Sequence, residues 1–239
     1  MSTMDSVSQL STSTQDYLKS LWALTEWSDT KVTTKVLADY MGLRLSSVSD
    51  AVKKLAQQGY VHHKPYAPIT LTEEGRAHAV AMIRRHRLIE TFLVETLGYT
   101  WDQVHDDAEI LEHAVSEFML QRLDAHLNYP ARDPHGDPIP TADGTVPQFH
   151  AEQLSTIAPD TRVVVQRVSD GDPSLLQFFD TSGITVGTRL RTQQAAPFSD
   201  TVEVLIDGQH PPLVLGKRAA DAVWVTAEPA EPAEPTGHN

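Results

Sequence analysis

The sequence of 239 residues contains no cysteine. This absence excludes disulfide bonds, thiol nucleophiles and cysteine-ligated metals, so any metal ion must be held by histidine, aspartate and glutamate. The sequence also has no apolar run near the ~20 residues that are needed to cross a bilayer. Its polar beginning, MSTMDSVSQLSTSTQ, lacks the basic head and apolar stretch of a secretory signal. We therefore expect a cytoplasmic protein without a membrane partner.

Positive charge is scarce, and the formal net charge is -13. Such a balance argues against a nucleic-acid partner, because phosphate contacts need lysine and arginine. The charge is unevenly spread, however. Residues 31–98 contain ten Lys/Arg and six Asp/Glu, a balance of +4, whereas residues 99–239 contain eight against twenty-two, a balance of -14. A locally basic segment ahead of an acidic body is compatible with DNA binding.

Three helical patterns follow one another between residues 17 and 59. Thr33 or Thr34 caps the second pattern, which ends at Gly42. The third starts with a serine cap and an acid three residues later, at 47–50. Two β-type segments around a proline-bounded turn, 60–64 and 69–71, come next. A helix-turn-helix followed by a hairpin is a winged helix, and we assign residues 1–75 to this domain.

The third helical pattern is the predicted DNA-reading element. Its apolar positions face inward, which leaves small hydroxyl residues and lysines outward near the helix start. Helix-turn-helix proteins insert that end into the major groove, where hydroxyls reach phosphates and base edges and lysines neutralise phosphate. The residues predicted to contact DNA are Thr34, Ser46, Ser47, Ser49, Asp50, Lys53, Lys54 and Lys64. The alternative is a winged helix that serves protein contacts or packing.

The remainder of the chain predicts two further domains. Long helical patterns at 72–97 and 106–126 indicate a helical domain over 76–142, whose helices pack together and, in a dimer, against a second subunit. Short β-branched runs between turns, one of them at 184–190, then favour a small β-barrel over 143–226. The AEPAEPAEP tract in 227–239 is predicted to be disordered. The expected fold class is α+β.

Metal-binding residue types gather on the two long helical patterns. On the second pattern they recur at offsets of three, four and seven, so they project from one side of the helix. On the first pattern, a histidine and a glutamate four residues apart share a face. These residues are His86 and Glu90 on the first pattern and His105, Glu109, Glu112 and His113 on the second. Two such stripes can enclose a divalent cation; the alternative is a solvated face with simple ion pairs.

Several motifs follow in the order and spacing of the diphtheria toxin repressor family. They are Tyr17-Leu18, the winged helix, RHRLxE at 85–90, VHDxAExxEH at 104–113 and PHGDPIP at 134–140. The sequence resembles that family from about residue 14 to residue 140, and the β-rich remainder is similar to the family's third, SH3-like domain. The resemblance implies a metal-dependent transcriptional repressor, not an enzyme, that binds operator DNA as a homodimer.

The resemblance also implies roles for individual residues. Asp16 falls where the iron-responsive members have a methionine, and Glu109 falls where they have a cysteine. Glu112 and His113 match the remaining primary ligands. The implied ancillary site consists of His86, Glu90 and His105, with Asp172 as the ligand from the third domain. Replacing two sulfur ligands by carboxylates, as in the manganese transport regulators, suits Mn(II).

Lys19 departs from the family pattern, because the two-domain manganese regulators with a binuclear centre have a glutamate there. We therefore expect two separate metal sites. The implied function is repression activated by Mn(II), which fixes the dimer for a palindromic operator, with manganese transport genes as expected targets. The alternatives are an Fe(II) or broad-spectrum sensor of the same family, a helical-bundle metalloenzyme, since Glu-x-x-His motifs also occur there, and a regulator that answers an organic ligand.

Overall fold

The computed structural model describes residues 7–64, 67–148, 150–196, 198–207 and 210–228. Most of the predicted disordered tail lies outside these residues. The chain divides into two compact units. Unit 1 extends to residue 147 except for the short segments 101–103 and 134–137, and unit 2 contains those segments and the chain from 148 onward. Among the described helices, none combines the length and the hydropathy that a membrane span requires.

Unit 1 begins with the elements of the predicted winged helix. They are α2 (Thr12–Glu26), α3 (Thr34–Met41), α4 (Leu45–Gln57), β1 (Val61–His62) and β2 (Thr70–Leu71). The caps of α3 are as predicted: the Thr33 side chain accepts from Val36 N, and Gly42 is left-handed. The two strands pair antiparallel. Apolar side chains from all five elements form one buried core, which includes Leu18, Leu37, Val52 and Val61.

The start of α4 differs from the prediction. The helix begins at Leu45, with Arg44 as the extended capping residue, so Ser47 lies inside the first turn and does not cap it. Arg44 takes this place because its carbonyl already accepts the first helical hydrogen bond, from Val48 N at 3.1 Å. The side chains at the very beginning of the helix are consequently exposed.

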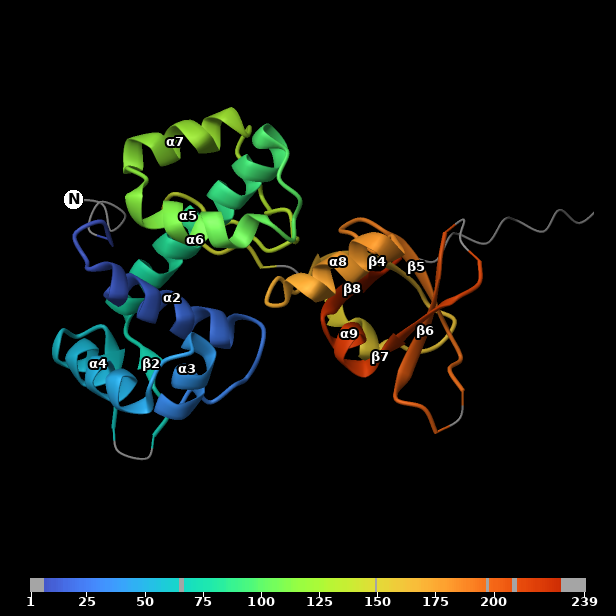
Figure 1. Ribbon diagram of the computed structural model, residues 1–239, viewed down its shortest axis with the longest axis horizontal. Coiled ribbons are helices and arrows are strands. Elements are labelled where there is room, and N and C mark those ends of the chain that lie inside the picture. Colours follow the sequence, from blue (N-terminus) through green and yellow to red (C-terminus); the bar gives the residue numbers. More distant parts are fainter. Residues whose placement is uncertain (1–6, 65–66, 149, 197, 208–209, 229–239) are drawn as a thin grey trace, which may run out of the picture. The chain divides into compact units, whose positions relative to one another are not determined.

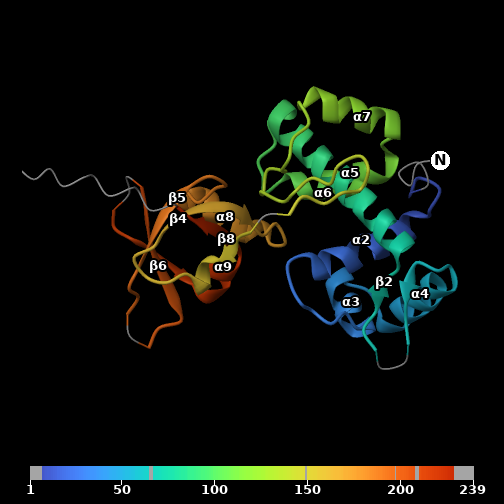
Figure 2. The same cartoon turned by 180° about the vertical axis from the view of Figure 1, so that it is seen from behind.

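The long helix α5 (Glu73–Leu97) links the two halves of unit 1. Thr72 caps its start, two glutamates occupy its first turn, and the left-handed Gly98 ends it. One side of α5 packs against α2 and another against α6 (Val104–Ala114) and α7 (Glu117–His126), as Figures 1 and 2 show. Because both predicted N-terminal domains share this helix, they form a single compact unit.

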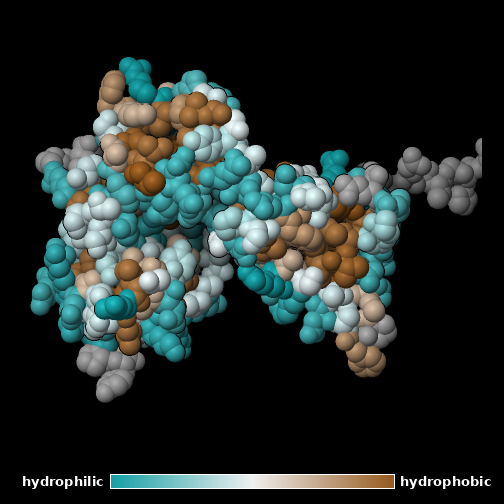
Figure 3. All heavy atoms as spheres, in the orientation of Figure 1, coloured by the Kyte–Doolittle hydropathy of each residue, from teal (hydrophilic) through white to brown (hydrophobic). Residues whose placement is uncertain are grey.

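The single helix predicted over 106–126 is wrong. The chain forms two helices there, and Ser116 between them has an extended backbone. The Ser116 hydroxyl accepts from Met119 N at 3.2 Å, so it caps α7 and offers the backbone an alternative to one continuous helix. The apolar side chains Ile110, Leu111, Phe118 and Met119 remain exposed around this break. Figure 3 shows such apolar side chains gathered over α7.

The start of α5 lies directly against the segment that joins α4 to β1. Thr72 Oγ1 donates to the carbonyl of Gly59 at 2.7 Å, and Thr72 N donates to the carbonyl of Tyr60 at 2.9 Å. A Cβ on Gly75 would come within 1.9 Å of that Tyr60 carbonyl, so only glycine permits the approach. The DNA-binding elements are therefore attached closely to α5.

Unit 2 is a six-stranded antiparallel sheet in the order β3-β8-β4-β5-β6-β7. Its strands are β3 (Glu152–Gln153), β4 (Arg162–Val168), β5 (Arg189–Gln193), β6 (Thr201–Ile206), β7 (Leu213–Gly216) and β8 (Val223–Ala227). Alternate residues of β4 and β8 are buried with side chains from α8 (Pro173–Ser182) and α9 (Lys217–Asp221) in one core. The α+β class is thereby confirmed.

Two details of unit 2 differ from the prediction. The strand expected at 184–190 begins only at Arg189, because Gly187 is left-handed and turns the chain before it. The helices α8 and α9 are missing from the predicted elements. The start of α8 has a recognisable signal, since Asp172 caps it and Pro173 occupies its first position.

Candidate metal centre

Three helices of unit 1 supply the predicted metal-binding side chains. Asp16 comes from α2, His86 and Glu90 from α5, and four further residues from α6, namely His105, Glu109, Glu112 and His113. The helices α2 and α6 both pack against α5, and side chains of α2 contact side chains of α6 directly. Side chains that the spacing placed on one side of α5 and on one side of α6 thus lie close together, while their role as metal ligands stays a prediction.

One group consists of Asp16, Glu112 and His113, whose donor atoms lie within 4.8 Å of one another. Nε2 of His113 lies 3.0 Å from Oδ1 of Asp16 and 3.9 Å from Oε1 of Glu112. The Glu112 side chain is fully buried, whereas the other two are partly exposed. Two carboxylates and one imidazole from two helices form a donor set that fits a divalent cation.

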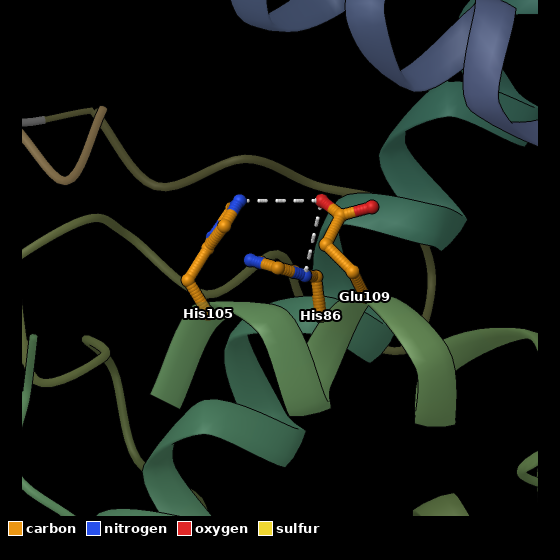
Figure 4. A group of neighbouring side chains, drawn as sticks. All are labelled: His86, His105 and Glu109. Atoms are coloured by element: carbon orange, nitrogen blue, oxygen red, sulfur yellow. Dashed lines mark ion pairs between the residues drawn. The ribbon is translucent and has the colours of Figure 1, made fainter. Parts of the chain in front are cut away.

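A second group consists of His86, His105 and Glu109, also within 4.8 Å. Figure 4 shows the two imidazoles and the carboxylate turned toward one another from α5 and α6. Glu90 lies beneath them, with Oε1 at 2.9 Å from Nε2 of His86 and 3.5 Å from Nδ1 of His105. The resemblance implied that Glu109 joins Asp16; the structure places its carboxylate with the two histidines.

Lys19 lies between these two groups. Its ammonium donates to Oε1 of Glu109 at 2.6 Å and to the two oxygens of Glu112 at 2.7 and 2.9 Å. The sequence identified Lys19 as a departure from the family pattern, and its position three residues after Asp16 puts it on the same side of α2. Lys19 contacts Glu109 and Glu112, which lie 90 and 93 residues further along the chain, so no local pattern in the sequence predicts these contacts.

The charges of the centre are strongly coupled. Burial raises the pKa of the Asp16 carboxyl, and Glu112 and Glu109 add to this rise against the opposing effect of His113 and Lys19. Burial alone would also raise the pKa of Glu109, but Lys19 and the two imidazoles outweigh it and hold that pKa below its usual value. The carboxylates of the two groups therefore differ in basicity. Positive charge nearby stabilises their ionised form.

His86 lies between two buried carboxylates. Its Nδ1 lies 2.6 Å from Oε2 of Glu112, and its Nε2 lies 2.9 Å from Glu90. Burial disfavours the imidazolium, but Glu90 and the hydrogen bond to Glu112 outweigh burial and raise the pKa of His86 to about 10. A metal ion on this imidazole must therefore replace a proton.

Known families match consecutive parts of the chain. Residues 9–68 match the N-terminal DNA-binding domain of the iron-dependent repressors, residues 72–141 their metal-binding and dimerisation domain, and residues 152–227 the FeoA domain. A solved manganese-dependent transcriptional repressor in complex with manganese is 49% identical, with a TM-score of 0.85, over 90% of this chain and 100% of that one.

The chain belongs to the iron-dependent repressor family. This family includes the iron-dependent repressor IdeR of Mycobacterium tuberculosis, 29% identical over 92% of this chain and 99% of that protein, and the diphtheria toxin repressor of Corynebacterium efficiens, 29% identical over 74% and 81%. The solved manganese regulator SloR is 32% identical, with a TM-score of 0.76, over 90% and 98%.

The predicted family is thus confirmed, and the protein is a metal-dependent transcriptional repressor with a divalent metal ion as corepressor. It is not an enzyme, which removes the helical-bundle metalloenzyme from the alternatives. Its partners are DNA, divalent metal ions and, through the dimerisation domain, a second repressor chain.

Asp172 has a local role in unit 2. Its carboxylate caps α8 by accepting from the backbone of Ser174 at 3.1 Å and Leu175 at 3.4 Å, and it pairs with Arg218. The hydrogen bond from the Ser174 hydroxyl, followed by those from the backbone, holds the Asp172 pKa below its usual value. The role of Asp172 as a metal ligand stays a prediction.

The predicted DNA contacts lie on the outer side of the winged helix. Most of them are exposed, and only Thr34 and Ser49 are half-buried: the exposed ones are Ser46, Ser47, Asp50, Lys53, Lys54 and Lys64. Lys53 and Asp50 pair with each other at 3.0 Å. Leu43, Arg44 and Leu45 are also exposed; the predicted helix start at 47 had placed them in the turn before the helix.

Proposed function

We propose that this repressor is activated by Mn(II). The observation that carries the proposal is the approach of Asp16 to His113, 3.0 Å apart, beside the buried Glu112. Oxygen and imidazole donors without thiolate or thioether suit Mn(II) better than softer ions. The solved relatives that are described as manganese-dependent repressors support the same metal. An Fe(II) response is the second candidate, because curated relatives are iron-dependent repressors.

The proposed centre couples metal binding to the position of the DNA-reading head. Asp16 belongs to α2 of the winged helix, whereas Glu112 and His113 belong to α6 of the dimerisation domain. A cation held by all three favours the arrangement in which the two helices meet. It therefore shifts the population toward that arrangement, by no more than its differential affinity. A further ion would use His86, Glu90, His105 and Glu109 as a separate site.

The apolar side chains around the break between α6 and α7 are the proposed subunit interface. Ile110 is 70% exposed and Phe118 is 68% exposed, and Leu111 and Met119 lie nearby in sequence. Exposed apolar clusters of this kind on a soluble domain mark association surfaces. A two-fold dimer would present two α4 helices to successive major grooves, about one helical turn apart, on a palindromic operator.

The proposed place of action is the cytoplasm, at operators of manganese transport genes. Mn(II) bound to the repressor signals that the cell holds enough of this metal. The repressor should then switch off the genes for Mn(II) import. The basic balance of the DNA-binding segment supports binding to double-stranded DNA, although the whole chain is acidic. We also propose the domain limits that the sequence predicts. They are 1–75 for the winged helix, 76–142 for the helical domain, 143–226 for the β domain and 227–239 for the tail.

A mobility-shift assay on the promoter region of the repressor's own gene tests the proposal. Mn(II), Fe(II) under anaerobic conditions, Zn(II) and a chelator are compared in parallel. We expect a shift with Mn(II) at the lowest concentration and none with the chelator. The Asp16→Ala, Glu109→Ala double variant should lose the response to Mn(II). The control Asp106→Ala removes an exposed acid from α6, the helix of Glu109, and should keep the response. A lower threshold for Fe(II) would favour the iron sensor.

A further inference from the structure

Lys19 contacts the very atoms that the proposed function assigns to metal ions. Its ammonium lies within 3.0 Å of Oε1 of Glu109, both carboxylate oxygens of Glu112 and Nδ1 of His86. The side chain is only 12% exposed. A lysine ammonium has three donors and no acceptor, so three carboxylate oxygens satisfy it completely. Lys19 therefore occupies the centre as a small cation would.

The position of this ammonium joins the two candidate sites. Glu109 belongs to the group with His86 and His105, and Glu112 belongs to the group with Asp16 and His113. Lys19 binds one carboxylate from each group. A cation in either group must therefore share a carboxylate with Lys19 or remove Lys19 from it.

The need for positive charge at this place is physical. Glu90 and Glu112 are fully buried, and Glu109 is partly buried next to them. Buried carboxylates without a compensating charge are strongly unfavourable. Lys19 supplies a positive charge in direct contact with Glu109 and Glu112.

We propose that Lys19 is an internal competitor of the metal ion. It stabilises the centre in the metal-free repressor and leaves Glu109 and Glu112 when the ion is bound, so it raises the metal concentration at which the repressor responds. The flexible stem of a lysine allows its ammonium to swing toward water without movement of α2. This inference rests on the proposed function, since it concerns the same metal centre.

A purely structural ion pair makes a different prediction from a competitor. If Lys19 only stabilised the fold of the centre, its loss would weaken both metal-free stability and metal binding. If Lys19 competes, its loss weakens metal-free stability but strengthens metal binding. The two effects of one substitution therefore have opposite signs only under the proposal.

The test compares the full-length parent with Lys19→Met, which keeps an unbranched apolar stem and removes the charge, and with Lys19→Arg, which keeps the charge. Lys217→Met removes an exposed lysine paired with Asp221 in unit 2 and serves as the matched control. Mn(II) affinity is measured by calorimetry, and the melting temperature is measured in chelator. We expect Lys19→Met to bind Mn(II) about tenfold more tightly and to melt earlier in chelator. The other two variants should bind within about twofold of the parent.

Unchanged or weaker Mn(II) binding by a folded Lys19→Met variant overturns the proposal. Amine labelling of the parent protein, read by mass spectrometry, gives a second measurement that needs no variant. Lys19 should react at least about fivefold faster when the repressor is saturated with Mn(II), while Lys217 keeps its rate; equal Lys19 rates overturn the proposal. If the parent binds no Mn(II) at all, the proposed function fails instead, which separates the two conclusions.

Discussion

The side-chain amide oxygen of Gln15 lies 2.6 Å from Nδ1 of His113. The amide nitrogen of the same residue donates to the carbonyls of Val7 at 2.8 Å and Leu10 at 3.2 Å. This arrangement fixes the orientation of the amide, so its oxygen must accept a hydrogen bond that Nδ1–H of His113 donates. The other ring nitrogen, Nε2, faces Asp16 and is therefore the nitrogen that is placed to bind a metal ion beside this carboxylate.

The first prediction concerns this contact. Gln15→Met keeps the volume of the buried side chain but removes the acceptor, and it should weaken Mn(II) binding by about tenfold or more. Gln15→Glu keeps an acceptor for Nδ1 and should recover most of the affinity. Calorimetry measures the affinity, and ¹⁵N spectra of the histidine rings report which nitrogen of His113 carries the proton. Parental affinity in Gln15→Met would contradict the assigned role.

A second prediction concerns the buried ion pair between α5 and α2. Arg87 donates to both carboxylate oxygens of Glu26, at 3.0 and 2.6 Å, and to the carbonyl of Pro138 at 2.8 Å. Both side chains of the pair are 8% exposed. Arg87→Met leaves the Glu26 carboxylate buried without this partner, so the free energy of unfolding should fall by about 3–5 kcal/mol.

Urea denaturation in chelator measures that change. The double variant Arg87→Met, Glu26→Met removes both charges of this pair and should recover part of the lost stability, because the Glu26 carboxylate is no longer buried without its partner. The recovery should be incomplete, because the buried Asp133, 3.6 Å from Arg87, still loses its contact with the guanidinium. If the double variant is as unstable as the sum of the two single variants, the pair is not coupled as the geometry indicates.

The sequence predicted local features of the fold better than distant contacts. The cap at Thr33, the end at Gly42 and the limits of the helix predicted at 72–97 all depend on neighbouring residues, and each has a chemical signature. The break at Ser116 does not stand out, because apolar residues continue at helical spacing on both sides of it. Several of these residues are exposed, and periodicity alone cannot distinguish a core stripe from a subunit interface.

The same limit applies to the metal centre. Spacing on one helix correctly predicted that His86 and Glu90, or Glu109 and Glu112, lie on a common side. It could not predict that Lys19 reaches Glu112, 93 residues away, or that Gln15 reaches His113, 98 residues away. Such contacts depend on how α2, α5 and α6 pack.

A third prediction tests the proposed subunit interface. Phe118→Lys places a charge on an exposed apolar side chain of α7, so the isolated fold should remain intact while the dimer dissociates. Analytical ultracentrifugation measures the association state, and circular dichroism confirms the helices. Val214→Lys, at a similarly exposed apolar residue of unit 2, is the control and should stay dimeric. A Phe118→Lys variant that remains a dimer places the interface elsewhere.

The last prediction concerns the pH dependence of stability. His78 on α5 is buried, its ring meets the ring of Tyr60 edge to face at 5.3 Å, and its Nε2 lies 4.0 Å from Oε1 of Glu74. Burial lowers the pKa of His78 below the ordinary 6.5, and Glu74 opposes this only in part. Below pH 6.5 the His78 ring is therefore protonated in the unfolded chain, whereas the folded chain disfavours its protonated form.

Stability should accordingly be lost as the pH falls through 6.5, by at most about 1.4 kcal/mol for each pH unit from this one residue. His78→Phe keeps an aromatic ring against Tyr60 and cannot titrate. The difference in the free energy of unfolding between variant and parent, measured in urea at pH 7.5 and again near pH 5.5, should shift in favour of the variant at the lower pH. A difference that is the same at both pH values would show that His78 does not resist protonation.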